Sequence, residues 1–186
     1  RGVPAALVLS GGLGQGPGSI AEAIEAAARA KGMRLVGPCS VGLIAPHARL
    51  NASVSAHQPL PGDLALVSQS GAVAAGLVEW GVSRSIGFSG VVSLGESLDV
   101  DFGDMLDYFA TDHRTRAILL YVESIRDARK FMSAARIAAR SKPVVVVKSG
   151  RHVPATGELG THVAALASAD AVYDAAFRRA GLLRVR

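Results

Sequence analysis

The sequence predicts an α/β fold in which helices pack on a doubly wound, mostly parallel β-sheet. Short runs rich in Val, Ile and Leu alternate with longer segments of helical periodicity, which is typical of βαβ units. The apolar fraction is 49 % against 19 % charged residues, and the 186 residues include 21 glycines, as in compact chains with tight turns. This length allows one full α/β domain and part of a second.

The N-terminal residues predict half of an α/β sheet. The expected elements are a strand over 5–9, a helix over 19–30 and a strand over 33–36. A glycine-rich segment follows the first strand, Lys31-Gly32 ends the helix, and Gly37-Pro38 ends the second strand. Two strands and one helix do not complete a sheet, so we expect the sequence to begin inside a domain.

Residues 45–62 show neither a helical nor a strand period and contain three prolines, Pro46, Pro59 and Pro61. Proline-rich, aperiodic segments are typical of connections between domains. We therefore predict a connector here and a boundary near Pro61. Residues 1–60 are assigned to the first unit with its linker, and residues 61–186 to the second.

The second unit repeats the strand and helix pattern through its length. We expect strands over 63–67, 88–92, 118–122, 144–147 and 182–185, and helices over 71–82, 102–110, 127–140 and 169–180. Apolar residues at 102, 105, 106 and 109 follow the i, i+3, i+4, i+7 spacing of a helix packed on a sheet. Five strands and four helices in this order predict a flavodoxin-like doubly wound layer.

Charge and cysteine content narrow the classes of function. The net charge is +5, but the basic residues are scattered along helices without the interleaved aromatics that stack on bases, so we expect no nucleic-acid partner. The longest apolar runs are far shorter than the ~20 residues that cross a bilayer, so we expect no membrane partner. The single cysteine, Cys39, cannot form an internal disulfide, which favours a cytoplasmic protein.

The turn after strand 63–67 is a candidate phosphate site. It consists of Ser68, Gln69, Ser70, Gly71 and Ala72 and opens a helix. Backbone N–H groups at such a turn point outward, and the helix dipole favours an anion there. The alternative is that serine simply caps the helix, as it commonly does; spacing alone leaves the two interpretations open.

Two further candidates follow strands of the same sheet. A long loop after Lys148 contains His162, and ligands of open α/β sheets bind beyond the carboxyl ends of strands. Glu123 follows strand 118–122, where a carboxylate can orient an imidazole by accepting a hydrogen bond from one ring nitrogen. A surface histidine and an exposed glutamate without roles are the alternatives.

An acidic turn formed by Glu96, Asp99 and Asp101 is a candidate cation site. A capping role for Asp101 at the start of helix 102–110 explains the turn more simply. The sequence has no metal-ligand spacing of histidines and cysteines, and we expect no metal site.

Five stretches together resemble the NDP-forming acyl-CoA synthetases, which include succinyl-CoA synthetase and ADP-forming acetyl-CoA synthetase. The resemblance covers the whole chain in order. The stretches are 35–42 (LVGPCSVG), 66–72 (LVSQSGA), 93–95 with 99–101 (SLG and DVD), 141–151 (SKPVVVVKSGR) and 161–177 (from Thr161-His162 to DAVYDAAF).

The resemblance implies a succinyl-CoA ligase-like domain preceded by the C-terminal part of a Rossmann-like CoA-binding domain. His162 would carry the phosphoryl group and Glu123 would orient its ring, with phosphate bound at 68–72. Coenzyme A would contact Gly11, Gly12, Pro38 and Cys39. The implied ligands are a small carboxylic acid, acyl-CoA and phosphate. The implied partner is an ATP-grasp domain or subunit that binds ATP or ADP with Mg²⁺, in an oligomer.

Residues 106–112 and 124–131 are most similar to a branch in which the synthetase is fused to a GNAT-type protein lysine acetyltransferase domain downstream and often serves regulation. Cys39 and Glu96 replace asparagines that are usual in the family, and Val163-Ala164 follow His162 where a small residue and glycine are usual. An extra carboxylate near a phosphoryl group repels it. An acyl-CoA-sensing regulatory module is therefore the alternative, but the presence of His162 and Glu123 favours catalysis.

Overall fold

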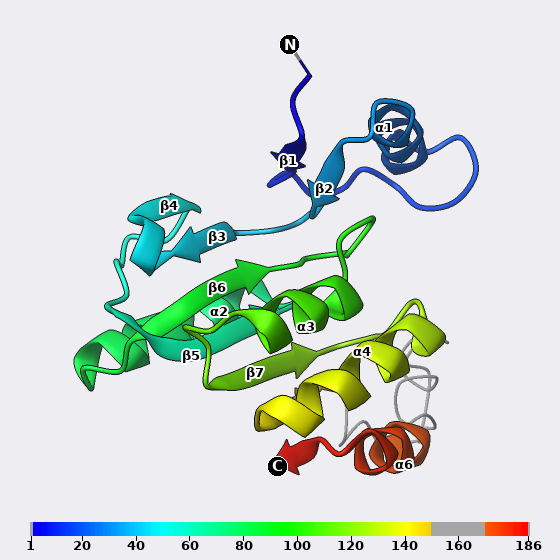
Figure 1. Cartoon of the computed structure of the whole chain (residues 1–186). Coiled ribbons are helices and arrows are strands. Elements are labelled where there is room, and N and C mark those ends of the chain that lie inside the picture. Colours follow the sequence, from blue (N-terminus) through cyan, green and yellow to red (C-terminus); the bar gives the residue numbers. More distant parts are fainter. Residues whose placement is uncertain (1, 150–169, 186) are drawn as a thin grey trace, which may run out of the picture.

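The computed structural model describes residues 2–149 and 170–185 and shows an α/β architecture (Figure 1). The elements in chain order are β1 (Ala5–Leu7), α1 (Ile20–Arg29), β2 (Arg34–Val36), β3 (Gly42–Ala45), the 3-10 helix η1 (Pro46–Ala48), β4 (Leu50–Ser53), β5 (Pro61–Ser68), α2 (Gly71–Ser83), β6 (Phe88–Ser93), α3 (Phe102–Thr111), β7 (Ala117–Val122), α4 (Ala128–Ser141), β8 (Val144–Lys148), α6 (Asp170–Ala180) and β9 (Leu183–Val185). No helix in the described ranges is long and apolar enough to cross a membrane.

The main sheet has the strand order β4-β3-β6-β5-β7-β8-β9. Strands β5 to β9 are all parallel. Counted from β5, their order is 2-1-3-4-5, which is the order of flavodoxin-like sheets. The predicted fold class is therefore confirmed, and the five expected strands each fall within two residues of the predicted bounds.

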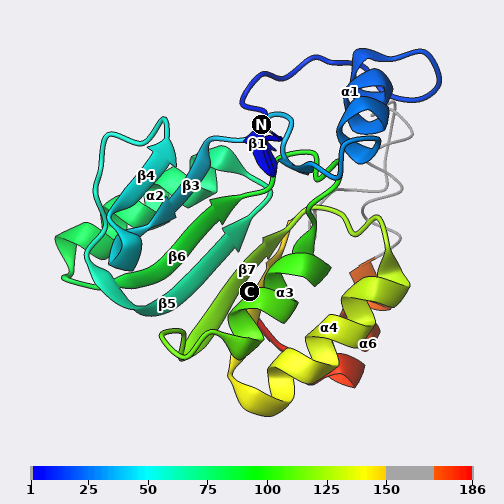
Figure 2. The same ribbon diagram turned by 45° about the horizontal axis from the view of Figure 1, so that its top comes forward.

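The chain changes direction across the sheet at β5. It passes from β5 to β6 on one side and then returns across β5 to β7 on the other, so α2 covers one face while α3, α4 and α6 cover the opposite face (Figure 2). Alternate residues of β5 accordingly face different cores: Leu66 packs toward α2, whereas Ala65 and Val67 pack with the three-helix side. The point between β5 and β7 is the topological switch point, where such folds bind ligands.

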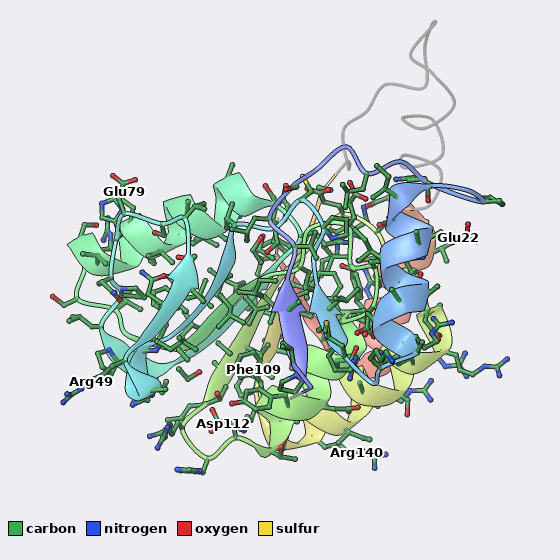
Figure 3. All side chains as sticks on the ribbon, turned by 90° about the horizontal axis from the view of Figure 1, so that it is seen from above. Glu22, Arg49, Glu79, Phe109, Asp112 and Arg140 are labelled. Carbon is green, nitrogen blue, oxygen red and sulfur yellow. The ribbon has the colours of Figure 1, made fainter. Side chains whose placement is uncertain are left out.

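The larger core lies between the sheet and the three helices. Phe131 of α4 lies edge-on to Phe102 and to Phe177, with ring centroids 6.4 and 6.0 Å apart. The predicted apolar stripe of α4 is confirmed at Phe131, Ala135 and Ala138, which are buried. Figure 3 shows the contrast between Phe109, which points inward from α3, and Glu79 and Arg140, which extend from the periphery.

The predicted connector over 45–62 is wrong in part, because β4 and η1 lie within it and β3 ends in it. Strand β3 pairs antiparallel with both β4 and β6 and so extends the main sheet at the edge of β6. Gly42 begins β3 with φ +97°, and a Cβ there would lie 2.1 Å from the carbonyl oxygen of Ala52. β3 forms by pairing with the edge of β6, which is distant in the sequence, and β4 forms by pairing with β3. The local sequence of these two short strands shows no strand period.

The strand, helix and strand predicted for residues 5–36 are confirmed as β1, α1 and β2, and the two strands form a parallel pair. We call these three elements the first unit. Helix α1 begins where expected, because the Ser19 hydroxyl accepts a hydrogen bond from the N–H of Glu22 and caps it. Gly32, with φ +64°, follows the helix at the predicted stop.

A ladder of main-chain hydrogen bonds joins the two units. The N–H groups of Glu96, Leu98 and Val100 donate to the carbonyls of Pro38, Gly37 and Leu35, at 2.9, 2.9 and 3.0 Å. The donors belong to the loop between β6 and α3, and the acceptors to the end of β2 and the residues after it. The main sheet and the first unit are thus held together by backbone groups.

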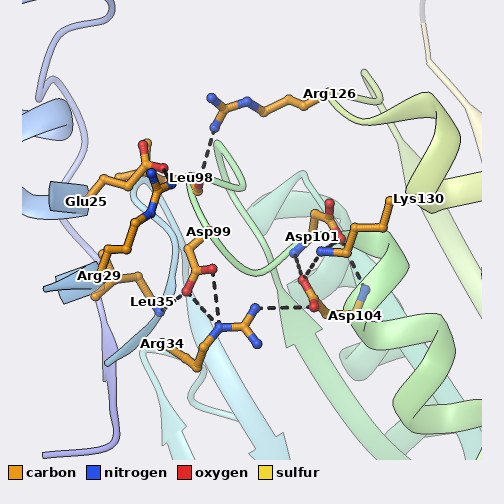
Figure 4. Close-up of polar contacts among 10 residues, drawn as sticks. All are labelled: Glu25, Arg29, Arg34, Leu35, Leu98, Asp99, Asp101, Asp104, Arg126 and Lys130. Atoms are coloured by element: carbon orange, nitrogen blue, oxygen red, sulfur yellow. Dashed lines mark hydrogen bonds and ion pairs between the residues drawn. The ribbon is translucent and has the colours of Figure 1, made fainter. Parts of the chain in front are cut away.

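Charged side chains flank this ladder (Figure 4). The Arg34 guanidinium lies between Asp99, at 3.0 Å, and Asp104, at 3.2 Å. The Lys130 ammonium donates to Asp104 at 2.6 Å and lies 2.9 Å from Asp101. Partial burial by itself would raise the pKa of Asp104, but hydrogen bonds from Lys130, from the N–H of Asp101 and from Arg34 hold that pKa below its usual 3.8.

We expect this cluster to lose its contribution to stability in acid. Because the folded-state pKa of Asp104 is depressed, the unfolded chain binds more protons below about pH 4, so the contribution is present above 3.8 and falls as pH drops through the folded value. Asp104→Asn should cost roughly 1 kcal/mol at neutral pH, a modest value because Arg34 is 51 % exposed. In urea unfolding at a series of pH values, the free energy of unfolding of this variant should fall less steeply below about pH 4 than that of the wild type.

Asp107→Asn is the matched control, since Asp107 lies on the same helix and forms no ion pair within the described ranges. If the free energy of unfolding of Asp104→Asn depended on pH as that of the wild type does, Asp104 would not be the source of the loss of stability in acid.

Candidate functional site

The candidate residues gather at the carboxyl edge of the parallel strands. Ser68 ends β5, Val122 ends β7 and Lys148 ends β8, and register pairs Val122 with Lys148. Glu123 is the first residue after β7, as predicted. The turn at 68–72 and Glu123 therefore meet on either side of the switch point.

The predicted phosphate turn has two kinds of serine. The Ser68 hydroxyl is fully buried and donates to the carbonyl of Ser70 at 2.7 Å, so it braces the turn and does not face a ligand. Ser70 is the N-cap of α2, and its hydroxyl accepts from the N–H of Val73 at 3.3 Å. The N–H groups of Gly71 and Ala72 lie in the first turn of α2 and have no acceptor among the described residues, which leaves two donors at the positive end of the helix.

Gly71 is required for the approach of a neighbouring segment to this helix start. A Cβ at Gly71 would lie 2.5 Å from Cγ1 of Val41, which follows the Gly-Pro-Cys-Ser segment of the first unit. The presence of glycine at position 71 is therefore explained by packing against Val41, whether or not its N–H group also binds an anion.

Gln69 connects the turn to the end of β7. Its side-chain oxygen accepts hydrogen bonds from the N–H groups of Glu123, at 2.7 Å, and Ser124, at 2.9 Å. Its own N–H donates to the carbonyl of Tyr121 at 3.1 Å. The side chain is nearly buried, with the residue 8 % exposed.

A cleft of about 670 Å³ lies between the first unit and the carboxyl edge of the sheet. Its walls come from both units: the glycine-rich loop and α1 on one side, and the loops after β5, β6 and β7 on the other. The lining residues are Gly14, Gln15, Gly16, Pro17, Ser19, Ala21, Glu22, Glu25, Cys39, Gln69, Gly95, Glu96, Leu98, Glu123, Ser124 and Arg126. The cleft thus brings together three predicted site residues, Cys39, Gln69 and Glu123, whereas Ser68, Ser70, Gly71 and Ala72 do not line it.

The predicted coenzyme A residues take different positions. Cys39 lines the cleft, while Gly11 and Gly12 are exposed and precede the part of the loop, 14–17, that does. Pro38 is buried, and its carbonyl accepts from Glu96 in the ladder. The cleft and the open glycine backbone suit an extended ligand such as coenzyme A; Pro38 serves the frame of this site.

Sequence reasoning missed several groups at this edge. Arg126 lines the cleft and donates to the carbonyls of Ser97, at 3.1 Å, and Leu98, at 3.3 Å. The Tyr173 hydroxyl of α6 accepts from the N–H of Ile125 at 3.3 Å. No local sequence pattern identifies these side chains as part of the site. They are identified only by the fold, which brings the loops after β6 and β7 close to α6.

Lys148 is almost fully buried, 6 % exposed, at the end of β8. Its ammonium donates to the carbonyl of Ser149 at 2.6 Å and lies 4.7 Å from the centre of the Tyr173 ring. Burial lowers the pKa of Lys148 from 10.5, Asp170 and Glu123 oppose that shift by their negative charge, and Arg184 adds to it. The lysine places a positive charge beneath the edge where Glu123 lies.

The acidic turn is explained by its structural contacts. Asp101 caps α3 in a capping box with Asp104, as the sequence favoured. Asp99 accepts from Arg34 and from the N–H of Leu35, at 2.7 Å for the latter. Within the described ranges no group of three or more His, Cys, Asp or Glu side chains is arranged to hold a metal ion. His162, the predicted phosphoryl carrier, lies outside the described residues.

Comparisons with known proteins agree with this architecture. Residues 61–186 match the family model of the succinyl-CoA ligase like flavodoxin domain. The chain is 40 % identical over 187 residues to subunit alpha of acetate–CoA ligase (ADP-forming) I of Pyrococcus furiosus, covering 99 % of this chain and 40 % of that protein. It is 34 % identical over 185 residues to acetate–CoA ligase (ADP-forming) of Methanocaldococcus jannaschii, covering 99 % and 26 %.

A solved structure shares the whole described fold. The apo form of the dinucleotide forming acetyl-coenzyme A synthetase 1 of Ca. Korarchaeum cryptofilum superposes with a TM-score of 0.87 at 35 % identity, covering 100 % of this chain and 40 % of that one. The chain spans 40 % or less of the length of these relatives. By its fold and by the match over residues 61–186, it belongs to the succinyl-CoA ligase-like flavodoxin domain family.

Proposed function

We propose that this chain is the ligase module of an NDP-forming acyl-CoA synthetase. The observation that supports it most is the cleft shared by the two units, which Glu123 and one residue of the phosphate turn, Gln69, line together at the switch point of the sheet. Relatives described as ADP-forming acetate–CoA ligases match nearly the whole chain. A small monocarboxylic acid is accordingly the substrate class that we propose.

The proposed reaction has three reversible steps. Phosphate attacks the thioester carbonyl of acyl-CoA, which forms acyl phosphate and releases the CoA thiol. An imidazole nitrogen of His162 then attacks phosphorus, which releases the carboxylate and forms phosphohistidine. NDP finally takes the phosphoryl group to give NTP and restores the free histidine. In the synthetic direction the steps run in reverse and consume NTP, acid and CoA.

The described residues supply the setting for the first two steps. The N–H groups of Gly71 and Ala72 and the dipole of α2 favour an anion. Glu123 accepts a hydrogen bond from one imidazole nitrogen, so that the other is unprotonated and nucleophilic. Coenzyme A contributes the thiol that carries the acyl group, and the cleft beside Cys39 and residues 14–17 is where we place it.

The NTP step requires a nucleotide site, which we assign to an ATP-grasp domain or partner subunit holding ATP or ADP with Mg²⁺. One relative is an alpha subunit by its description, and the Korarchaeum protein has been solved with phosphate and ADP. The protein is therefore proposed to act in an oligomer with this partner. Its single cysteine, Cys39, favours a location in the cytoplasm.

Intact-mass measurement of the full-length protein after incubation with ATP and Mg²⁺ tests the proposal. We expect an acid-labile gain of one phosphoryl group in the wild type and none in His162→Ala. His152→Ala, which removes a histidine from the same segment, is the matched control and should gain the group as the wild type does. If acyl-CoA binds but neither wild type nor control gains a phosphoryl group, the catalytic proposal fails and the regulatory, GNAT-linked interpretation takes its place.

A further inference from the structure

We infer that Gln69 is a positioning residue that fixes Glu123 at the switch point, and that it acts through its side-chain oxygen. The inference rests on the proposed role of Glu123. It changes the expectation for Gln69, which the sequence placed among the phosphate ligands.

The hydrogen bonds of Gln69 leave little freedom at its acceptor. An amide oxygen has two lone pairs, and here one accepts from the N–H of Glu123 at 2.7 Å and the other from that of Ser124 at 2.9 Å. The two N–H donors also settle the orientation of the amide, because the opposite orientation would set its NH₂ group against them. The residue is 8 % exposed, so water does not readily replace the side chain.

The topology explains why a side chain is needed at this point. β5 and β7 are paired neighbours up to Ser68 and Tyr121. Beyond them the chain leaves for opposite faces, to α2 from β5 and to α4 from β7, so no regular ladder can continue between the two turns. Gln69 bridges this gap from both ends, with its N–H on the carbonyl of Tyr121 and its side-chain oxygen on the next two free N–H groups.

A second side chain holds the same loop farther along. The Tyr173 hydroxyl accepts from the N–H of Ile125 at 3.3 Å, so three consecutive N–H groups after β7 end on side chains of other elements. The shorter bonds belong to Gln69, and they act on Glu123 itself. Loss of Gln69 should therefore free Glu123 while Tyr173 still anchors the loop at Ile125.

The variants Gln69→Leu and Gln69→Glu separate the acceptor from the rest of the side chain. Leucine fills similar space without an acceptor, whereas glutamate keeps an oxygen that can accept from both N–H groups but adds a negative charge near phosphate. Ser89→Ala is the control for the loss of a buried hydrogen bond elsewhere, since the Ser89 hydroxyl bonds the Thr115 hydroxyl near the amino ends of β6 and β7, at the opposite ends of these strands from the cleft loops.

The test uses the full-length protein and two readouts. In hydrogen exchange, Gln69→Leu should speed exchange at Glu123 and Ser124 by about tenfold or more, and Gln69→Glu and Ser89→Ala should stay within about threefold of the wild type. In turnover of acetyl-CoA, inorganic phosphate and ADP, which regenerates the free histidine, Gln69→Leu should lower kcat by about tenfold or more with KM for phosphate within about twofold. Gln69→Glu should raise that KM instead.

Two results would overturn the inference: unchanged exchange at Glu123 and Ser124 in Gln69→Leu, or a raised KM for phosphate with unchanged kcat in that variant, which is the behaviour of a direct phosphate ligand. A wild type that forms no phosphohistidine refutes the proposed function separately, and the exchange comparison then decides by itself whether Gln69 fixes the position of Glu123.

Discussion

Gly95→Ala should destabilise the protein by about 2–5 kcal/mol, because the new Cβ has no space and the backbone has a conformation that alanine disfavours. Gly95 has φ +57°, and a Cβ there would lie 2.0 Å from the carbonyl oxygen of Pro38. That carbonyl cannot simply move away, since it accepts from the N–H of Glu96 in the ladder between the units. We expect a large decrease in the urea midpoint and a disturbed cleft, which Gly95 lines.

Gly76→Ala provides the matched control for this substitution. Gly76 lies within α2, is exposed, and has no atom within 4 Å of its Cβ position. Alanine there should stabilise the protein by about 0.5–1 kcal/mol through helix propensity. Equal midpoints for the two variants would show that the contact between Gly95 and Pro38 does not hold the units together.

Phe177→Ala should cost about 3–5 kcal/mol, as truncation of a fully buried phenylalanine does. Phe177 has no exposed surface, and its ring lies between those of Phe131, at 6.0 Å, and Tyr173, at 5.8 Å. Through its ring contact with Phe131, the residue packs α6 against α4. Urea unfolding monitored by far-UV circular dichroism measures the loss.

Val172→Ala tests whether the effect depends on burial and not on α6 as such. Val172 lies on the same helix and is 70 % exposed, so its truncation should change stability by no more than about 0.5 kcal/mol. A loss for Phe177→Ala as small as that of the control would mean that α6 does not contribute to the core.

The helices and strands of the second unit could be predicted because the sequence signals that specify them lie within or next to each element. Strands β5 to β9 and their helices each carry a period, a cap or a glycine stop in their own residues, as Asp127 does at the start of α4. β3 and β4 were not predictable in the same way. β3 owes its structure to the edge of β6, where Leu43 pairs with Val92, 49 residues later in the sequence, and β4 pairs in turn with β3. No local pattern records such an edge.

In the candidate site, too, the residues that local sequence places were predictable and those placed by the tertiary fold were not. The positions of Glu123 and of the turn at 68–72 follow from the strands that precede them, so the sequence could place both. The role of Gln69 depends on β5 and β7 being neighbours whose chains then separate, which no spacing in the sequence reveals. Likewise Pro38 was predicted as a ligand contact, while its carbonyl is used by Glu96 between the units.

The backbone ladder between the units also bears on how this family can diverge. Glu96 and Leu98 contact the first unit through their N–H groups, so these hydrogen bonds between the units do not depend on which side chains stand at the two positions. Glu96 and Leu98 line the cleft. Evolution can therefore exchange those side chains, and with them the chemistry that the cleft presents to a ligand, while the frame stays in place. Selection on the frame falls instead on Gly95, where no other residue fits.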